Sequence, residues 1–384
     1  TVKVVANANS KYPVYSSASK GIILDSLEVD ADAAASINTT YNIQLIKTSS
    51  PLTNKGTVIF QNTGRFIDTT LPTAKYLVDT TQGTVEFAEG SSTVENINPA
   101  DDTAADYNNV IISGTVKLAG NIKTKGSFTV SQALDGNSKA LNIGTKLTAT
   151  ATITDVTTLS VNGDASIGAD ITTSGSQKYQ GKVTLTQDVT LKAKNNITFE
   201  DNATITGASY NLTLDNDSTH QADYDLKKDV TVKSLTANIA TGKKLSIPSP
   251  VVITAKDGFT VTGAGTVNLG TESQTADTKI ITEKKDINFS GTGTVTVNSP
   301  VILDTTSGAA SASGNITIIN PFQGKIADSQ PLTIKAGTGN VNLQSDIGTL
   351  VSLGDVTITD KDTTLSQAKE LKAKTVSITG AKIK

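Results

Sequence analysis

Short stretches in which apolar and polar residues alternate recur along the chain, and polar turn residues separate them. This alternation over only a few residues is typical of β-strands that bury one face. The segment from Lys182 to Phe199 illustrates it, with polar turns at 187–188 and 194–196. Its apolar positions are Val183, Leu185, Val189, Leu191, Ile197 and Phe199. The pattern predicts two or three short strands per repeat, without intervening helices.

A unit of Gly-Thr-Val, followed two residues later by another apolar residue, recurs at five places. The units begin at Gly56, Gly83, Gly114, Gly265 and Gly293, with local spacings of 27, 31 and 28 residues. Repeats of roughly 20 to 50 residues indicate a solenoid or propeller, in which each unit buries its face against its neighbours. We predict that the following residues face inward: Val58, Phe60, Val85, Phe87, Val116, Leu118, Val267, Leu269, Val295 and Val297. The same alternation places Phe128, Phe199 and Phe289 in the core.

The fold class that this pattern predicts is all-β, and specifically a right-handed parallel β-helix whose coils stack at roughly 4.8 Å. A string of β-sandwiches is the alternative, but no repeat of sandwich-domain length is present. Residues 56–384 are assigned to an elongated, repetitive β-solenoid of about 11 to 16 coils. Residues 1–55 lack the Gly-Thr-Val unit and contain a helix-compatible run from Asp30 to Ala35. We assign them to an N-terminal cap or irregular β region.

Composition agrees with a β fold and narrows the range of partners. The 384 residues include 61 Thr and 30 Gly, only 4% are aromatic, and Cys, Met and Trp are absent. Thr favours strands and Gly favours turns. The net charge is −3 and the single arginine is Arg65, so a nucleic-acid partner is not expected. No apolar run approaches the roughly 18 residues of a membrane span. Because the chain begins at Thr1 and lacks Met, we interpret it as a processed or excised segment.

Two segments resemble repeats of known bacterial proteins. Residues 174–214, from Ser-Gly-Ser-Gln-Lys-Tyr-Gln-Gly through Ile-Thr-Phe to Asn-Leu-Thr-Leu, resemble the repeats of filamentous-haemagglutinin-like exoproteins and autotransporter passengers. Residues 107–114, Tyr-Asn-Asn-Val-Ile-Ile-Ser-Gly, are similar to a repeat of large bacterial surface β-helix proteins. The resemblance implies a secreted right-handed β-helix that acts as an adhesin, surface fibre or biofilm scaffold. The chain departs from those families in lacking a recognisable secretion domain and translocator barrel.

One acidic loop matches part of a calcium-binding pattern. Asp215, Asp217 and Thr219 occupy the first three oxygen positions of a calcium loop. The match then fails, because His220 stands where Gly is needed and Leu226 where the bidentate Glu belongs. We interpret the loop as solvated turn carboxylates, with a calcium site as the alternative. His220, the only histidine, is expected to be an exposed loop residue.

If the chain were an enzyme, its candidate catalytic residues would be the acidic cluster of Asp101, Asp102 and Asp106. Many polysaccharide-cleaving enzymes share the coil architecture, and hydrolysis requires two carboxylates at roughly 5 to 9.5 Å. The chain offers one His, one Arg and no Cys, and no Trp lines a sugar cleft. We therefore assign no catalytic residue and no cofactor, and interpret the cluster as a solvated loop. The lysine pairs that begin at Lys227, Lys243 and Lys284 are interpreted as solvated turn charges.

These observations favour a noncatalytic, extracellular adhesin or structural component of a bacterial cell surface, acting through extended faces of the solenoid. The expected partners are a surface receptor, a glycan or neighbouring subunits of a homo-oligomer. A self-assembling surface-layer or filament subunit is one alternative. A carbohydrate-active lyase or hydrolase is the alternative from another class.

Overall fold

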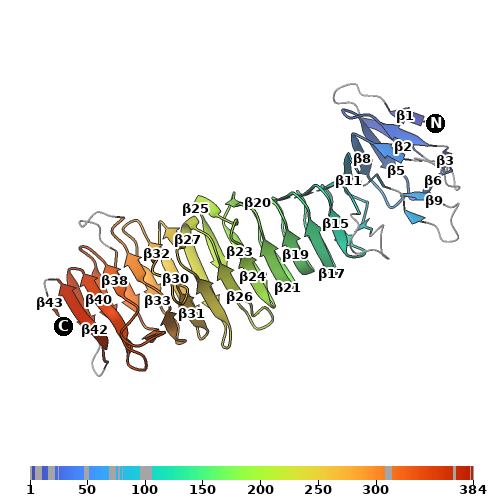
Figure 1. Cartoon of the computed structure of the whole chain (residues 1–384). Coiled ribbons are helices and arrows are strands. Elements are labelled where there is room, and N and C mark those ends of the chain that lie inside the picture. The colour runs from blue at the N-terminus through green and yellow to red at the C-terminus, as the bar shows by residue number, and fades with distance from the viewer. Residues whose placement is uncertain are drawn as a thin grey trace. The chain divides into compact units, whose positions relative to one another are not determined.

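The computed structural model describes residues 2–4, 11–15, 22–24, 26–46, 52–68, 75–76, 78–79, 81–95, 106–307, 314–365, 369–380 and 382–383. All helical or extended secondary structure in these residues is β-strand, as predicted (Figure 1). The chain forms two compact units, Thr1–Ser174 and Gly175–Lys384. Counted over both units, parallel strands stack as a β-solenoid of about 14 turns. The right-handed sense of the coil stays a prediction.

The first unit contains one long parallel stack and several shorter ones. The long stack consists of β2 (Lys11–Tyr15), β5 (Ala34–Asn38), β8 (Thr57–Phe60), β11 (Thr84–Phe87), β13 (Asn109–Ile112), β16 (Ser127–Val130), β18 (Lys146–Ala149) and β20 (Asp164–Ile167). Two further stacks share the strands β17 (Leu134–Ile143) and β19 (Ile153–Val161); one also contains β12 (Thr93–Val94) and β14 (Val116–Leu118), and the other contains β15 (Ile122–Thr124).

Two small sheets lie near the start of the first unit. One is the parallel set β1 (Val2–Val4), β4 (Leu27–Val29) and β7 (Leu52–Asn54). The other is β3 (Ile22–Leu24), β6 (Ile43–Leu45) and β9 (Phe66–Asp68), to which β10 (Lys75–Tyr76) adds in antiparallel orientation.

The second unit is built from three parallel stacks, which we call stacks A, B and C (Figure 1). Stack A consists of β24 (Asn196–Phe199), β26 (Asp223–Leu226), β28 (Lys244–Ile247), β31 (Thr266–Leu269), β34 (Val295–Val297) and β37 (Phe322–Gly324). The strand β21 (Ile171–Tyr179) contains the division between the units, and its last three residues pair with β24.

The strands β25 (Ile205–Leu214) and β27 (Val230–Ile239) are long enough to belong to both stack B and stack C. Stack B continues with β22 (Val183–Leu185), β29 (Val252–Ala255), β32 (Thr278–Ile281), β35 (Val301–Asp304), β38 (Leu332–Lys335), β40 (Leu353–Thr359) and β42 (Ala373–Thr379). Stack C continues with β23 (Val189–Ala193), β30 (Phe259–Gly263), β33 (Ile287–Phe289), β36 (Ile316–Ile318), β39 (Asn340–Leu343), β41 (Asp362–Leu365) and β43 (Lys382–Ile383).

The predicted inward positions are confirmed. All ten apolar residues of the Gly-Thr-Val units are at most 3% exposed, and Phe128, Phe199 and Phe289 are buried with them. In the first unit, Val85 and Phe87 lie directly on Val58 and Phe60. The repeat is less uniform than the sequence suggested, because the unit at Gly114 leads into β14, which stacks on β12 rather than on β11.

Close contacts between the backbones of successive turns explain why the repeat contains glycine. At Gly293, a Cβ atom would collide with the backbone oxygen of Gly265, the glycine of the preceding unit in the same stack. A side chain at Gly56 would likewise collide with the backbone oxygen of Ala33. Successive turns therefore approach backbone to backbone, and only glycine fits between them.

The run from Asp30 to Ala35, although compatible with a helix, does not form one. A turn at 31–32 leads into β5, where Ala35 and Ile37 are fully buried. Pairing with β8 holds this segment in an extended conformation, and this tertiary contact outweighs local helix propensity. A separate cap formed by residues 1–55 stays a prediction, although β5 belongs to the same parallel stack as β8.

Arg65, the only arginine, is a structural residue of the first unit. It is 4% exposed, and its Nε donates to Glu95 Oε2 at 2.8 Å. Its terminal nitrogens donate to the backbone oxygens of Asn62, Gly64, Ser91 and Thr93. All five N–H donors are thereby used. The guanidinium also lies 4.7 Å from the ring centre of Phe60 and 5.4 Å from that of Phe87, a cation–π arrangement.

Replacing Phe87 by Asp tests the inward assignment. Phe87 is 0% exposed and its ring contacts Phe60 and Tyr107 at centroid distances of 5.7 and 5.8 Å. The substitution would remove these contacts and bury an unpaired charge, so we expect the free energy of unfolding to fall by about 4 kcal/mol or more. Thr129→Asp, at an outward position of β16, is the matched control and should change stability little. Thermal or urea unfolding compares the two, and equal stability would contradict the assignment.

Candidate functional site

The acidic loop after β25 is closed by a lysine from the neighbouring coil. Lys192 Nζ lies 2.9 Å from Asp215 Oδ2 and 3.2 Å from Asp217 Oδ2. Asp217 Oδ1 accepts hydrogen bonds from the backbone N–H groups of Thr219 and His220 and from the Thr219 hydroxyl, each at 2.8 Å. The ammonium of Lys192 thus contacts both predicted calcium-binding carboxylates.

Electrostatics agree with this internal pairing. Partial burial opposes ionisation of Asp217, but the hydrogen bonds from Thr219, His220 and Lys192 outweigh it and hold the pKa of Asp217 well below its usual value. The hydrogen bond to Asp215 raises the pKa of Lys192. His220 is half-buried rather than exposed as expected, because its Nδ1 lies 3.1 Å from Asp217 Oδ1. Calcium binding stays a prediction here, and it would have to displace the lysine ammonium.

The acidic cluster, interpreted from the sequence as a solvated loop, is only partly described. Asp101 and Asp102 lie outside the described residues. Asp106 is 3% exposed, and its Oδ2 accepts a hydrogen bond from the backbone N–H of Lys123 at 2.9 Å. The carboxylate therefore contacts the next coil, and the interpretation as a solvated loop is wrong for Asp106.

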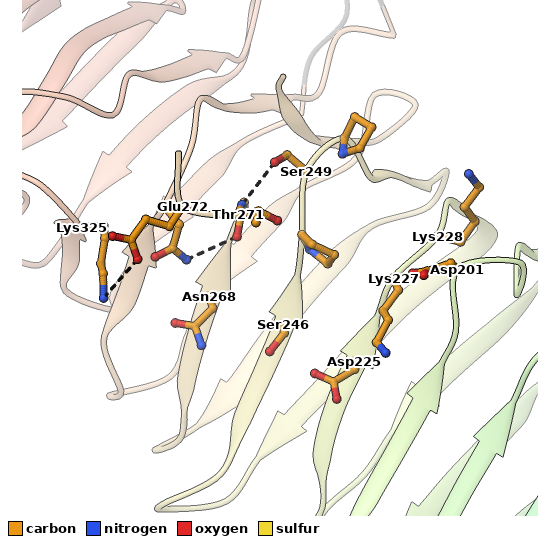
Figure 2. Close-up of a pocket in the computed structure, with 14 residues that line it drawn as sticks. Asp201, Asp225, Lys227, Lys228, Ser246, Ser249, Asn268, Thr271, Glu272 and Lys325 are labelled. Carbon is orange, nitrogen blue, oxygen red and sulfur yellow. Dashed lines mark hydrogen bonds and ion pairs between the residues drawn. The ribbon is translucent and has the colours of Figure 1, made fainter. Parts of the chain in front are cut away.

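A groove of about 760 Å³ lies on the outer side of stack A (Figure 2). Its floor carries Asp225, Ser246 and Asn268, which are Cα partners in the consecutive strands β26, β28 and β31. Each stands between two buried residues of its strand, so the alternation that fills the core also points these polar groups outward.

Loops that follow the carboxyl ends of the stack A strands also line the groove. The turn between β28 and β29 contributes Pro248, Ser249 and Pro250, and the segment after β31 contributes Gly270, Thr271 and Glu272. These two loops are joined, because Thr271 N–H donates to Ser249 Oγ at 3.2 Å. Asn298 Nδ2 donates to the Gly270 backbone oxygen at 3.4 Å.

Both positive and negative side chains line the groove. Lys227, Lys228 and Lys325 line it together with Asp201, Asp225 and Glu272, so the lining charges balance. Lys227 Nζ lies 2.6 Å from Glu200 Oε2, and this hydrogen bond raises the pKa of Lys227 and lowers that of Glu200. At the other end, Lys325 Nζ lies 3.9 Å from Glu272 Oε2.

Sequence reasoning missed this groove. The side chains of its floor come from different coils, so register alone brings them together. Lys227 and Lys228 were interpreted as solvated turn charges and were not assigned to any binding site. The usable signal was the single polar residue between two apolar ones, as in Tyr224-Asp225-Leu226, repeated one coil later as Leu245-Ser246-Ile247.

No family model matches the chain, and the searches of curated proteins and of solved structures gave no match either. Within the part of the chain that the structure describes, no helix has the length and apolarity to cross a membrane. Over the same residues, no group of three or more His, Asp or Glu side chains is arranged to hold a metal ion.

The acidic loop yields a direct test with calcium. Because Lys192 contacts both carboxylates, we expect about 1 mM calcium to leave the melting temperature of the chain unchanged; binding a hundredfold tighter than this concentration would add about 2.7 kcal/mol. Lys192→Gln, which removes the ammonium, should be the variant that gains calcium-dependent stabilisation. A calcium-induced increase in the unaltered chain that Asp217→Asn abolishes would establish the metal site instead.

Proposed function

We propose that the chain is a noncatalytic adhesin or structural component of a bacterial cell surface, acting through the outer faces of its solenoid. The observation that supports this most is a regular polar column on stack C. At the outward central position of successive strands it contains Thr190, Thr213, Thr236, Thr260, Asn288, Thr317, Asn342 and Thr364, all in register.

This threonine–asparagine column crosses the coils of the second unit at the strand spacing of about 4.8 Å. An extended surface of small polar side chains suits attachment over a large area better than chemistry at one point. The groove on stack A adds a concave feature of the kind that ligands occupy. Both features lie on the outside of a core filled by apolar residues.

The cell-surface assignment draws on the sequence resemblance to filamentous-haemagglutinin-like exoproteins and autotransporter passengers. Part of the resembling segment, residues 183–185, 189–193 and 196–199, forms strands of the three stacks, as that class would require. Extracellular location, a receptor or glycan partner, and the absence of a cofactor are parts of this proposal.

Self-assembly into a layer or filament is a second candidate, and strand β42 favours it. Val376 of β42 is 45% exposed, whereas its register partner Val356 is 1% exposed. An apolar position that is buried on β40 is thus exposed on β42, and a further strand stacked on β42, such as one of a neighbouring subunit, would cover it.

Antibody labelling of intact cells of the producing organism tests the proposed function. We expect antibodies raised against the purified chain to label unbroken cells, and external protease to remove the label. A cytoplasmic protein of the same cells is the control for breakage. Label that appears only after lysis would overturn the cell-surface proposal. Turnover of a polysaccharide by the purified chain would overturn its noncatalytic part.

A further inference from the structure

The polar groups on the groove floor have unused hydrogen-bonding capacity. Ser246 and Asn268 make no side-chain hydrogen bond to any residue that the structure describes. Their neighbours on the same stack, Asp225 and Thr296, continue the row at one position per coil. Figure 2 shows Asp225, Ser246 and Asn268 on adjacent strands, with Lys227 beside Asp225. The floor therefore presents acceptors and donors in turn, at intervals of about 4.8 Å.

The charges of the groove disfavour a polyanion. Three lysines are offset by three carboxylates among the lining residues. Two of the lysines also have acidic neighbours, Lys227 at Glu200 and Lys325 at Glu272. A nucleic acid or a sulfated or uronic polymer gains its affinity from uncompensated positive charge, which this lining does not concentrate.

The backbone of the floor disfavours an extended peptide. Peptides that add to a sheet need a free strand edge. Here β28 is paired with β26 on one side and β31 on the other, and β31 is paired with β28 and β34. Pro248 and Pro250 are the only residues with apolar side chains in the lining, which gives no pocket for a large apolar anchor.

We propose that this groove binds an uncharged linear oligosaccharide that runs across the coils. A sugar hydroxyl both donates and accepts, so a row of hydroxyls pairs with the carboxylate of Asp225, the hydroxyl of Ser246 and the amide of Asn268. The flanking lysines donate to hydroxyl or ring oxygens, and the proline rings cover the apolar C–H face. This proposal rests on the proposed function as a surface-binding protein, and it names the ligand class of the groove.

The test begins with the full-length chain on an array of linear glycans that contains neutral hexose oligomers, from dimer to hexamer, beside sulfated and uronic ones. We expect binding to neutral oligomers that strengthens with their length and changes little with added salt. Titration calorimetry with the neutral oligomer that binds best then measures the affinity of the variants.

Ser246→Ala and Ser166→Ala form a matched pair. Both serines are half-buried at the outward central position of a strand, β28 or β20, and neither makes a side-chain hydrogen bond within the described residues. Loss of the groove hydroxyl should weaken binding roughly fivefold or more, and Ser166→Ala should leave it unchanged. Thermal unfolding checks that both variants are folded.

Three results would overturn the proposal: no binding to any neutral oligomer, salt-sensitive binding to anionic glycans alone, or equal weakening by both variants. None of them bears on whether intact cells display the chain, so the proposed function stands or falls on its own experiment.

Discussion

In-register pairing between successive coils is the constraint on which the rest of the structure depends. The parallel ladder sets each residue on its counterpart one coil away, as Val295 lies on Val267 and Val297 on Leu269. Since side chains alternate between the two faces of a strand, a shift of one residue would turn every buried position outward. Register therefore decides at once what fills the core and what faces the solvent.

The core and the surface features follow from that register. Aromatic rings from neighbouring coils meet inside, with Phe289 5.6 Å from Phe259 and 5.0 Å from Phe322 between ring centres. Outside, the same repetition lines up the threonine–asparagine column of stack C and the groove floor of stack A. Where turns pack tightly, glycine is required, as at Gly293 against Gly265. The recurring glycine and the recurring alternation of apolar and polar residues thus both result from the in-register stacking of the coils.

Local patterns predicted the fold class and the inward residues, because the alternation of buried and exposed positions can be recognised in the sequence of each single strand. They do not suffice where contacts between coils decide the outcome. The alanine-rich run before Ser36 is compatible with a helix, yet pairing with β8 makes it a strand. Asp217 resembles a calcium ligand in its own loop, but Lys192, from the previous coil, already contacts it. The groove joins Asp225, Ser246 and Asn268 across three coils, and single-sequence spacing does not contain that register.

Disulfide formation between engineered cysteines measures the register directly, since the chain has no cysteine of its own. Thr236 and Thr260 are Cα partners on adjacent coils, where strand spacing brings their Cα atoms to about 4.8 Å and allows a disulfide. The account predicts that the variant with Thr236→Cys and Thr260→Cys cross-links on oxidation. Thr262 pairs with Asn238 instead, so Thr236→Cys with Thr262→Cys, about 8 Å apart, should stay reduced. Equal cross-linking of the two pairs, or preference for the second, would contradict the in-register solenoid.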